Sequence, residues 1–220
     1  MPGLHTGDAP AHSVYVGDAL AHSVYVGDAL VWRRDPETLS YTAPGVVTVP
    51  VPIWARFVDR VAIGGGSAGH GGNGANGQPG RGGTAGSWSS DTIDLAALSA
   101  TSLTVTVGAG GTGTAREQLG NPGTASTITV PGGSALTAAG GVGIAGYGGI
   151  FDKAVEAGAS PGDHTHLGTT YTGGIGGATR NTPGTAPGGA GAGGNGGIFG
   201  SGSPGANGGD GRVWLTFRSY

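Results

Sequence analysis

Two histidines separated by one residue are the strongest candidates for metal chemistry in this chain. They lie in the run Asp-His-Thr-His at positions 163–166. On an extended strand, residues i and i+2 face the same side, so the imidazoles of His164 and His166 could reach one metal ion. Imidazole nitrogens suit transition metals. The flanking Ser-Pro-Gly and Leu-Gly-Thr-Thr runs are equally typical of an exposed polar loop.

Several glycine patterns match enzyme motifs formally, but they do not indicate an enzyme. Gly69, Gly71 and Gly74 have the spacing of a dinucleotide fingerprint, and residues 65–69 have that of a nucleophile elbow. Both motifs need a helix next, and the run Asn-Gly-Ala-Asn-Gly-Gln-Pro-Gly that follows is incompatible with one. Carboxylates are sparse, and no pair is spaced for acid–base work. There is no cysteine, which excludes thiol chemistry and disulfides. We therefore predict that the chain is not an enzyme.

Apolar side chains that interrupt the glycine-rich stretches are the best candidates for binding. These residues are Tyr147, Phe151, Tyr171, Ile175 and Phe199. Loops on a rigid base often carry contacts, and an aromatic face suits a sugar ring or a groove in another protein. The same side chains could instead fill the ends of the glycine-rich region or pack beneath the strands.

The composition excludes some partners. The chain carries 10 basic and 13 acidic residues, with a net charge of −3. The basic residues are scattered, whereas nucleic-acid binding needs a basic face, so we expect no nucleic-acid partner. No apolar run reaches membrane-spanning length, and residues 1–5 lack a signal-peptide pattern, so we expect synthesis in a cytoplasm and no membrane insertion.

The elements that must position these residues are predicted to be β-strands. Apolar residues alternate with polar residues over 46–54, 103–107, 127–130 and 213–217, which is the period of half-buried strands. Prolines at 50 and 52 share one face of the first segment, as on an edge strand. Residues 87–98 suit either a strand or a helical turn. We predict an all-β chain in which these strands pack face to face as a β-sandwich.

A decapeptide repeat precedes the sandwich. Residues 7–16 read GDAPAHSVYV, residues 17–26 read GDALAHSVYV, and a degenerate third copy begins at Gly27. Each copy places a Gly-Asp turn pair before a β-favouring run. We interpret residues 1–38 as a docking segment, either a small β-meander or a ribbon that pairs with neighbouring chains. Residues 39–220 then form the glycine-rich sandwich domain.

Glycine recurs every third residue between the strands. The chain has 52 glycines in 220 residues, and the periodic tracts cover about 64–86, 138–149, 173–177 and 188–211. A period of three matches polyproline II geometry, and glycine at each turn leaves one face without side chains. We predict an antiparallel bundle of polyglycine II helices held by backbone hydrogen bonds. The alternative is that the tracts are flexible loops.

Three segments resemble the glycine-rich domain found in phage minor tail proteins and tail fibres. Residues 41–66 resemble its opening turn, valine-rich strands and glycine burst. Residues 103–113 resemble its second strand, and GGDGRVWLTF at 208–217 resembles its end. The insertion 150–172 has no counterpart in that pattern.

The resemblance implies a structural, non-catalytic role at a phage tail tip or fibre. The expected partners are other tail subunits and a host cell-surface glycan or protein, and the expected location is the virion. Some trimeric phage fibres hold a single iron with one His-x-His from each chain, which implies a homotrimer with iron at His164 and His166; otherwise no cofactor is expected. A second resemblance, to glycine-rich surface proteins of bacterial cell envelopes, supplies the alternative function.

Overall fold

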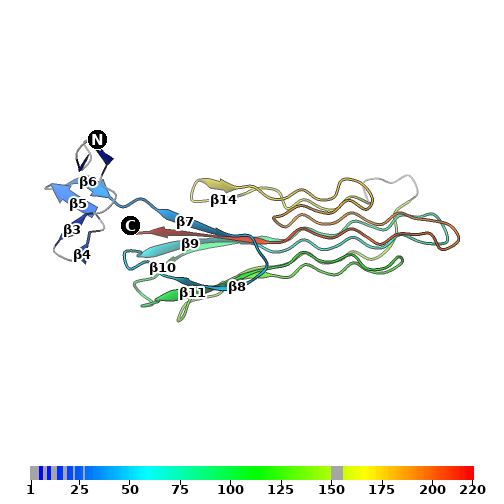
Figure 1. Ribbon diagram of the computed structural model, residues 1–220, viewed down its shortest axis with the longest axis horizontal. Coiled ribbons are helices and arrows are strands. Elements are labelled where there is room, and N and C mark those ends of the chain that lie inside the picture. The colour runs from blue at the N-terminus through cyan, green and yellow to red at the C-terminus, as the bar shows by residue number, and fades with distance from the viewer. Residues whose placement is uncertain are drawn as a thin grey trace.

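The computed structural model describes residues 5–6, 9–10, 14–16, 19–21, 23–26, 28–149 and 156–220. It confirms the all-β class and the sandwich (Figure 1). The strands are β1 His5–Thr6, β2 Ala9–Pro10, β3 Tyr15–Val16, β4 Ala19–Leu20, β5 Ser23–Val26, β6 Ala29–Arg33, β7 Glu37–Tyr41, β8 Gly45–Pro50, β9 Phe57–Ile63, β10 Trp88–Asp94, β11 Ser102–Val107, β12 Ser126–Thr129, β13 Leu136–Ala138, β14 His164–His166, β15 Thr169–Tyr171 and β16 Arg212–Arg218.

Two antiparallel four-stranded sheets form the sandwich. Their strand orders are β10-β9-β16-β7 and β13-β12-β11-β8. The apolar faces predicted from period-two alternation meet between the sheets, where Val105, Ile128 and Leu215 are fully buried. The segment left open at 87–98 forms strand β10 over Trp88–Asp94.

The first predicted strand is shorter than its apolar pattern. Strand β8 ends at Pro50, and Ile53 is 93% exposed although it continues the alternation. Two prolines in the segment remove backbone donors, so the ladder with β11 cannot continue through it. The chain turns at 53–54, and Trp54 returns to the core. The prediction that residues 46–54 form one strand is therefore wrong at its C-terminal end, while β8 does lie at a sheet edge as its prolines indicated.

One arginine lies inside the sandwich. Arg60 is fully buried, and its Nε donates to Asp91 Oδ1 at 2.7 Å while Nη2 forms an ion pair with the same carboxylate. Its Nη1 donates to the carbonyls of Ile128 at 3.1 Å and Ser134 at 2.8 Å. Because Ile128 belongs to β12, this side chain connects the two sheets.

The glycine tracts extend side by side from one end of the sandwich (Figure 1). Backbone N–H groups of segment 64–73 donate hydrogen bonds to carbonyls of three other segments in turn, 118–124, 203–209 and 78–84. The donor–acceptor pairs are Gly65–Thr124, Ala68–Asn121 and Gly71–Gln118; Gly66–Gly209, Gly69–Ala206 and Gly72–Ser203; and Ser67–Thr84, His70–Arg81 and Asn73–Gln78. In each set the donor advances by three residues while the acceptor retreats by three. This is the repeat of antiparallel helices with three residues per turn, as predicted for polyglycine II.

The same segment also has parallel neighbours. Its carbonyls accept from the segment 191–197, and both partners advance by three residues; the pairs are Gly191–Ser67, Gly194–His70 and Gly197–Asn73. The expected antiparallel bundle is therefore only part of the arrangement. A helix with three residues per turn projects hydrogen-bonding groups in three directions, so an interior tract bonds to more segments than the one it joins through a turn.

Glycine is required where the tracts touch. A Cβ added at Gly69 would lie 2.8 Å from Gly193 N and closer still to the Ala192 carbonyl. One added at Gly177 would lie 2.8 Å from Ala192 N and closer still to the Thr182 carbonyl. Side chains at these turns would separate the backbones and break the hydrogen bonds between them.

The N-terminal repeats form separate hairpins. β1 pairs with β2, β3 with β4, and β5 with β6, each as its own two-stranded antiparallel sheet. The repeated β-favouring run forms strand β5 in the second copy. The described strands are thus hairpins rather than one continuous meander, and they lie beyond the end of the sandwich opposite the glycine tracts (Figure 1).

Candidate functional site

The candidate site begins with the alternation of strand β16. Val213, Leu215 and Phe217 point into the sandwich and are fully buried. The intervening residues therefore point outward, and all four are half-buried: Arg212, Trp214, Thr216 and Arg218. Because β16 lies between β9 and β7, this row occupies the middle of the sheet's outer face.

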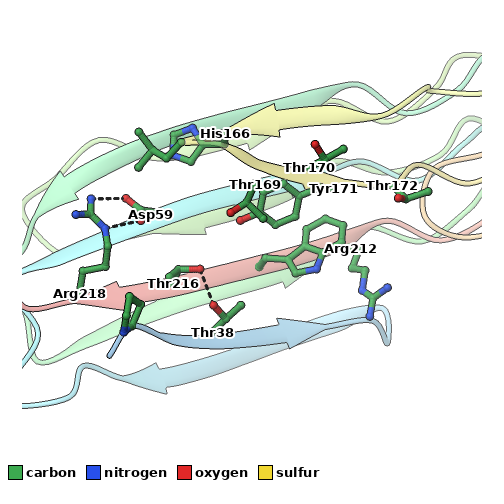
Figure 2. Close-up of a pocket in the computed structure, with 13 residues that line it drawn as sticks. Thr38, Asp59, His166, Thr169, Thr170, Tyr171, Thr172, Arg212, Thr216 and Arg218 are labelled. Atoms are coloured by element: carbon green, nitrogen blue, oxygen red, sulfur yellow. Dashed lines mark hydrogen bonds and ion pairs between the residues drawn. The ribbon is translucent and has the colours of Figure 1, made fainter. Parts of the chain in front are cut away.

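The hairpin β14–β15 covers part of this face and makes a groove (Figure 2). The groove has a volume of about 740 Å³, which is within the range of small-ligand sites. Its walls carry threonines from three strands and the segment after β15, two arginines and two aromatic rings. The lining residues are Pro36, Thr38, Asp59, His166, Leu167, Thr169, Thr170, Tyr171, Thr172, Arg212, Trp214, Thr216 and Arg218.

At one end of the groove, an arginine and an aspartate neutralise each other. Arg218 Nε and Nη2 donate to the two carboxylate oxygens of Asp59 at 2.6 and 2.8 Å. Thr92 Oγ1 donates to Asp59 Oδ1 at 2.7 Å. The hydrogen bond to Asp59 raises the pKa of the Arg218 guanidinium, and the charge of Asp59 acts in the same direction. This pair therefore fixes that end of the wall.

Arg212 occupies the other end of the groove (Figure 2). Its guanidinium lies over the Trp214 ring, 5.2 Å from the ring centroid. Its Nε is buried and has no hydrogen-bond partner within the part of the chain that the structure describes. No ion pair with Arg212 is found among those residues. The end of the groove at Arg212 thus carries a cation that its protein neighbours leave unneutralised.

Trp214 and Tyr171 form the floor of the groove between these ends, and Trp88 packs against Trp214 from outside the lining. Trp88 and Trp214 stack with centroids 5.7 Å apart, and Tyr171 meets Trp214 edge-on at 5.1 Å. Trp88 Nε1 donates to the Gly162 carbonyl at 3.1 Å, which fixes the hairpin to the sheet. Burial raises the pKa of Tyr171, so its hydroxyl stays protonated at neutral pH. The floor combines apolar ring surface with a hydroxyl group.

The two predicted metal ligands lie on strand β14 and share one face, as expected. His164 Nε2 lies 2.9 Å from Ser90 Oγ, and His164 stacks on Trp88 at 5.3 Å. His166 Nε2 lies 3.4 Å from Thr92 Oγ1. Both rings thus contact strand β10 of the same chain. Within the described residues, no cluster of three or more His, Cys, Asp or Glu side chains could hold a metal. The trimeric iron site stays a prediction.

The predicted binding residues do not form one site. Tyr171 lines the groove, whereas Tyr147 packs edge-on against His70 in the glycine bundle, with centroids 5.1 Å apart. Ile175 is 68% exposed, and Phe199 is 99% exposed at the turn between two tracts. Phe151 lies outside the described residues. Of the four that the structure describes, Tyr171 alone lines the groove.

A comparison with protein families identifies the domain. A family model described as a glycine-rich domain matches residues 42–218. The chain belongs to this glycine-rich domain family. The match spans the tracts, every strand of the two sandwich sheets except β7, and every groove residue except Pro36 and Thr38. No curated protein matches the chain. In the described part of this glycine-rich domain, no helix has the length and apolar character needed to cross a membrane.

No sequence motif points to most of the groove residues. The signal that could have found them is the strand pattern at 212–218, because alternation places Trp214 on the polar side of its strand. A large aromatic on that side needs a cover, which the hairpin β14–β15 provides. Asp59 gave no such signal, since most of β9 is buried on both faces.

Proposed function

We propose that this glycine-rich domain is part of a structural minor tail protein of a phage, at the tail tip or in a fibre. In this role the chain acts by display and attachment and not by catalysis. The observation that carries the proposal is the bundle of glycine tracts, in which backbone hydrogen bonds repeat every three residues. Such a bundle supplies a stiff support without a large apolar core.

The two ends of the molecule suit different tasks in this proposal. The decapeptide hairpins at one end would dock to other tail subunits, because two-stranded sheets bury little surface by themselves. The opposite end presents the turn between two tracts, where Ile198 is 58% exposed and Phe199 is 99% exposed. Exposed apolar groups on a rigid support suit contact with a host surface protein or glycan. The chain would be made in the host cytoplasm and carried in the virion.

Location is the first test. Particles released by lysis of the producing culture would be purified and labelled with a gold-conjugated antibody against residues 39–220. We expect gold at one end of the tail. Label confined to the cell-envelope fraction would refute the proposal and favour the alternative, a glycine-rich surface protein of the bacterial envelope.

Attachment is the second test. Virions carrying Phe199→Ser should adsorb to host cells several-fold more slowly, while their tail composition stays unchanged. Ile53→Ser is the matched control, because Ile53 is also exposed but lies in the β8–β9 connection, away from the tract turns. Equal adsorption by both variants would exclude Phe199 from host contact. A homotrimer, and with it iron at His164 and His166, requires a trimeric mass in analytical ultracentrifugation.

A further inference from the structure

From the side chains that line it, we infer that the groove between hairpin β14–β15 and the sheet binds an acidic saccharide, with the sugar's carboxylate at Arg212. The inference does not rest on a virion location, because it concerns only residues of this chain. It assigns a ligand class to a groove that is separate from the tract turns proposed for host contact.

The Arg212 guanidinium at one end of the groove favours an acidic ligand. Arg218 is neutralised by Asp59, whereas the Arg212 Nε is buried without a partner in the described chain. A guanidinium without a neutralising partner is unfavourable in a partly desolvated groove. Because Nε itself is enclosed by protein atoms, a carboxylate would form its charge-assisted hydrogen bonds with the terminal nitrogens of this half-buried side chain. An anionic group is therefore the natural occupant of this end.

The floor and walls select for a sugar. The half-buried Trp214 offers ring surface to the apolar face of a pyranose, and the buried Tyr171 packs edge-on against it and holds it in place. Thr169 lies exposed on the same side of β15 as Tyr171, and its hydroxyl can both donate to and accept from a sugar hydroxyl. Figure 2 shows Thr170 and Thr172 on the hairpin side of the groove, above Arg212.

The length suits more than one ring. Arg212 and Arg218 mark opposite ends of the groove and lie six residues apart on one strand (Figure 2). A strand rises about 3.3 Å per residue, so the ends are roughly 20 Å apart. A short acidic oligosaccharide could extend from Arg212 toward the balanced pair at Asp59 and Arg218.

The experiment is an NMR titration of the purified full chain with 3′-sialyllactose, digalacturonic acid and lactose. Tryptophan indole ¹H–¹⁵N signals report on the site, because Trp214 lies in the groove and Trp54 lies in the sandwich core. We expect an acidic probe to shift the Trp214 signal at up to about 10 mM, where even a millimolar complex is near saturation. Lactose should shift it far less, and the Trp54 signal should stay in place.

Arg212→Gln should weaken binding of the acidic probe about tenfold or more, because it removes a charge-assisted contact. Arg81→Gln is the matched control, since Arg81 is exposed in a glycine tract, and it should bind as the parent does. Unchanged Trp54 signals and an unchanged melting temperature would show that Arg212→Gln is folded. The inference is overturned if neither acidic probe shifts Trp214, if lactose binds equally well, if triglutamate peptide binds in place of the sugars, or if folded Arg212→Gln binds unchanged.

Discussion

Replacing Gly69 with alanine tests whether bare backbone contact holds the glycine bundle together. The added Cβ would lie 2.8 Å from Gly193 N and closer to the Ala192 carbonyl, whereas ordinary carbon contacts are about 3.5–4.0 Å. Segment 64–73 must therefore move away from segment 188–197 by roughly 1 Å. Such a shift would strain or break the hydrogen bonds from Gly191, Gly194 and Gly197 that join these segments.

The magnitude follows from those three bonds. Each contributes about 1 kcal/mol net, and together they give about 3 kcal/mol. Alanine returns about 0.4–1 kcal/mol by restricting the unfolded chain. We expect Gly69→Ala to lower the free energy of unfolding by about 2–3 kcal/mol, the difference between these two terms.

Gly74→Ala is the matched control in the same tract. A Cβ there would lie 3.2 Å from Arg116 Nη1 and from Glu117 Oε1, which are the far ends of flexible side chains, and 3.3 Å from the backbone Cα of Gly200, well outside the backbone distances met at Gly69. We expect its effect on the free energy of unfolding to stay below about 1 kcal/mol. Urea unfolding followed by tryptophan fluorescence measures both variants, and amide exchange at Gly191 and Gly194 reports on the contact itself. Equal stability of the two variants, or fast exchange at these amides in the parent chain, would refute close packing of the tracts.

Three further predictions concern the sandwich, the groove and the tract turn. Arg60→Met leaves Asp91 without its ion-pair partner and should lower the free energy of unfolding in urea by about 3 kcal/mol. Arg56→Gln breaks an exposed pair and should lower it by less than about 1 kcal/mol. Equal losses in the two variants would contradict the role given to Arg60. Burial raises the folded-state pKa of Tyr171 above the ordinary value of 10.0. The contribution of Tyr171 to the free energy of unfolding is therefore fully present below pH 10 and is lost as the pH rises through the folded-state pKa. Melting temperatures of Tyr171→Phe should accordingly fall less steeply above pH 10 than those of the parent, and parallel curves would exclude this residue. Phe199 has a φ of 50° and an exposed side chain, so Phe199→Gly should keep the melting temperature or raise it slightly, and a marked drop would mean that the ring packs against the domain.

The sandwich and the tracts were predictable from the sequence because each rests on a strict period. Alternation at 103–107 and 213–217 identified strands whose inward residues are buried, and a three-residue glycine period identified helices whose hydrogen bonds repeat every three residues. Both periods are local properties of the chain. The end of β8 was misjudged because the apolar pattern continued to Ile53 after the prolines had ended the ladder.

The site was less predictable because its parts are brought together by pairing of distant segments. Asp59 and Arg218 meet only because β9 pairs with β16. Nothing in the sequence marks Arg60 as a core residue, since its burial depends on carbonyls of β12 and of the β12–β13 connection, far away in the chain. His164 and His166 were found as a pair, yet their contacts with Ser90 and Thr92 require the hairpin to fold onto β10.

The order of strands and tracts along the chain explains how a small apolar core can stabilise long, ordered glycine tracts. Ordering a residue costs about 1–2 kcal/mol in backbone freedom, and glycine loses the most. In this chain β9 leads into the tract that begins at Gly64, and that tract returns to β10; β11 and β12 enclose the next in the same way. The sandwich therefore holds both ends of these tracts close together, which lowers the entropic cost of closing each loop. The groove depends on the same arrangement, because its wall β14–β15 lies in the chain between β13 and β16 and packs on the outer face of a sandwich sheet.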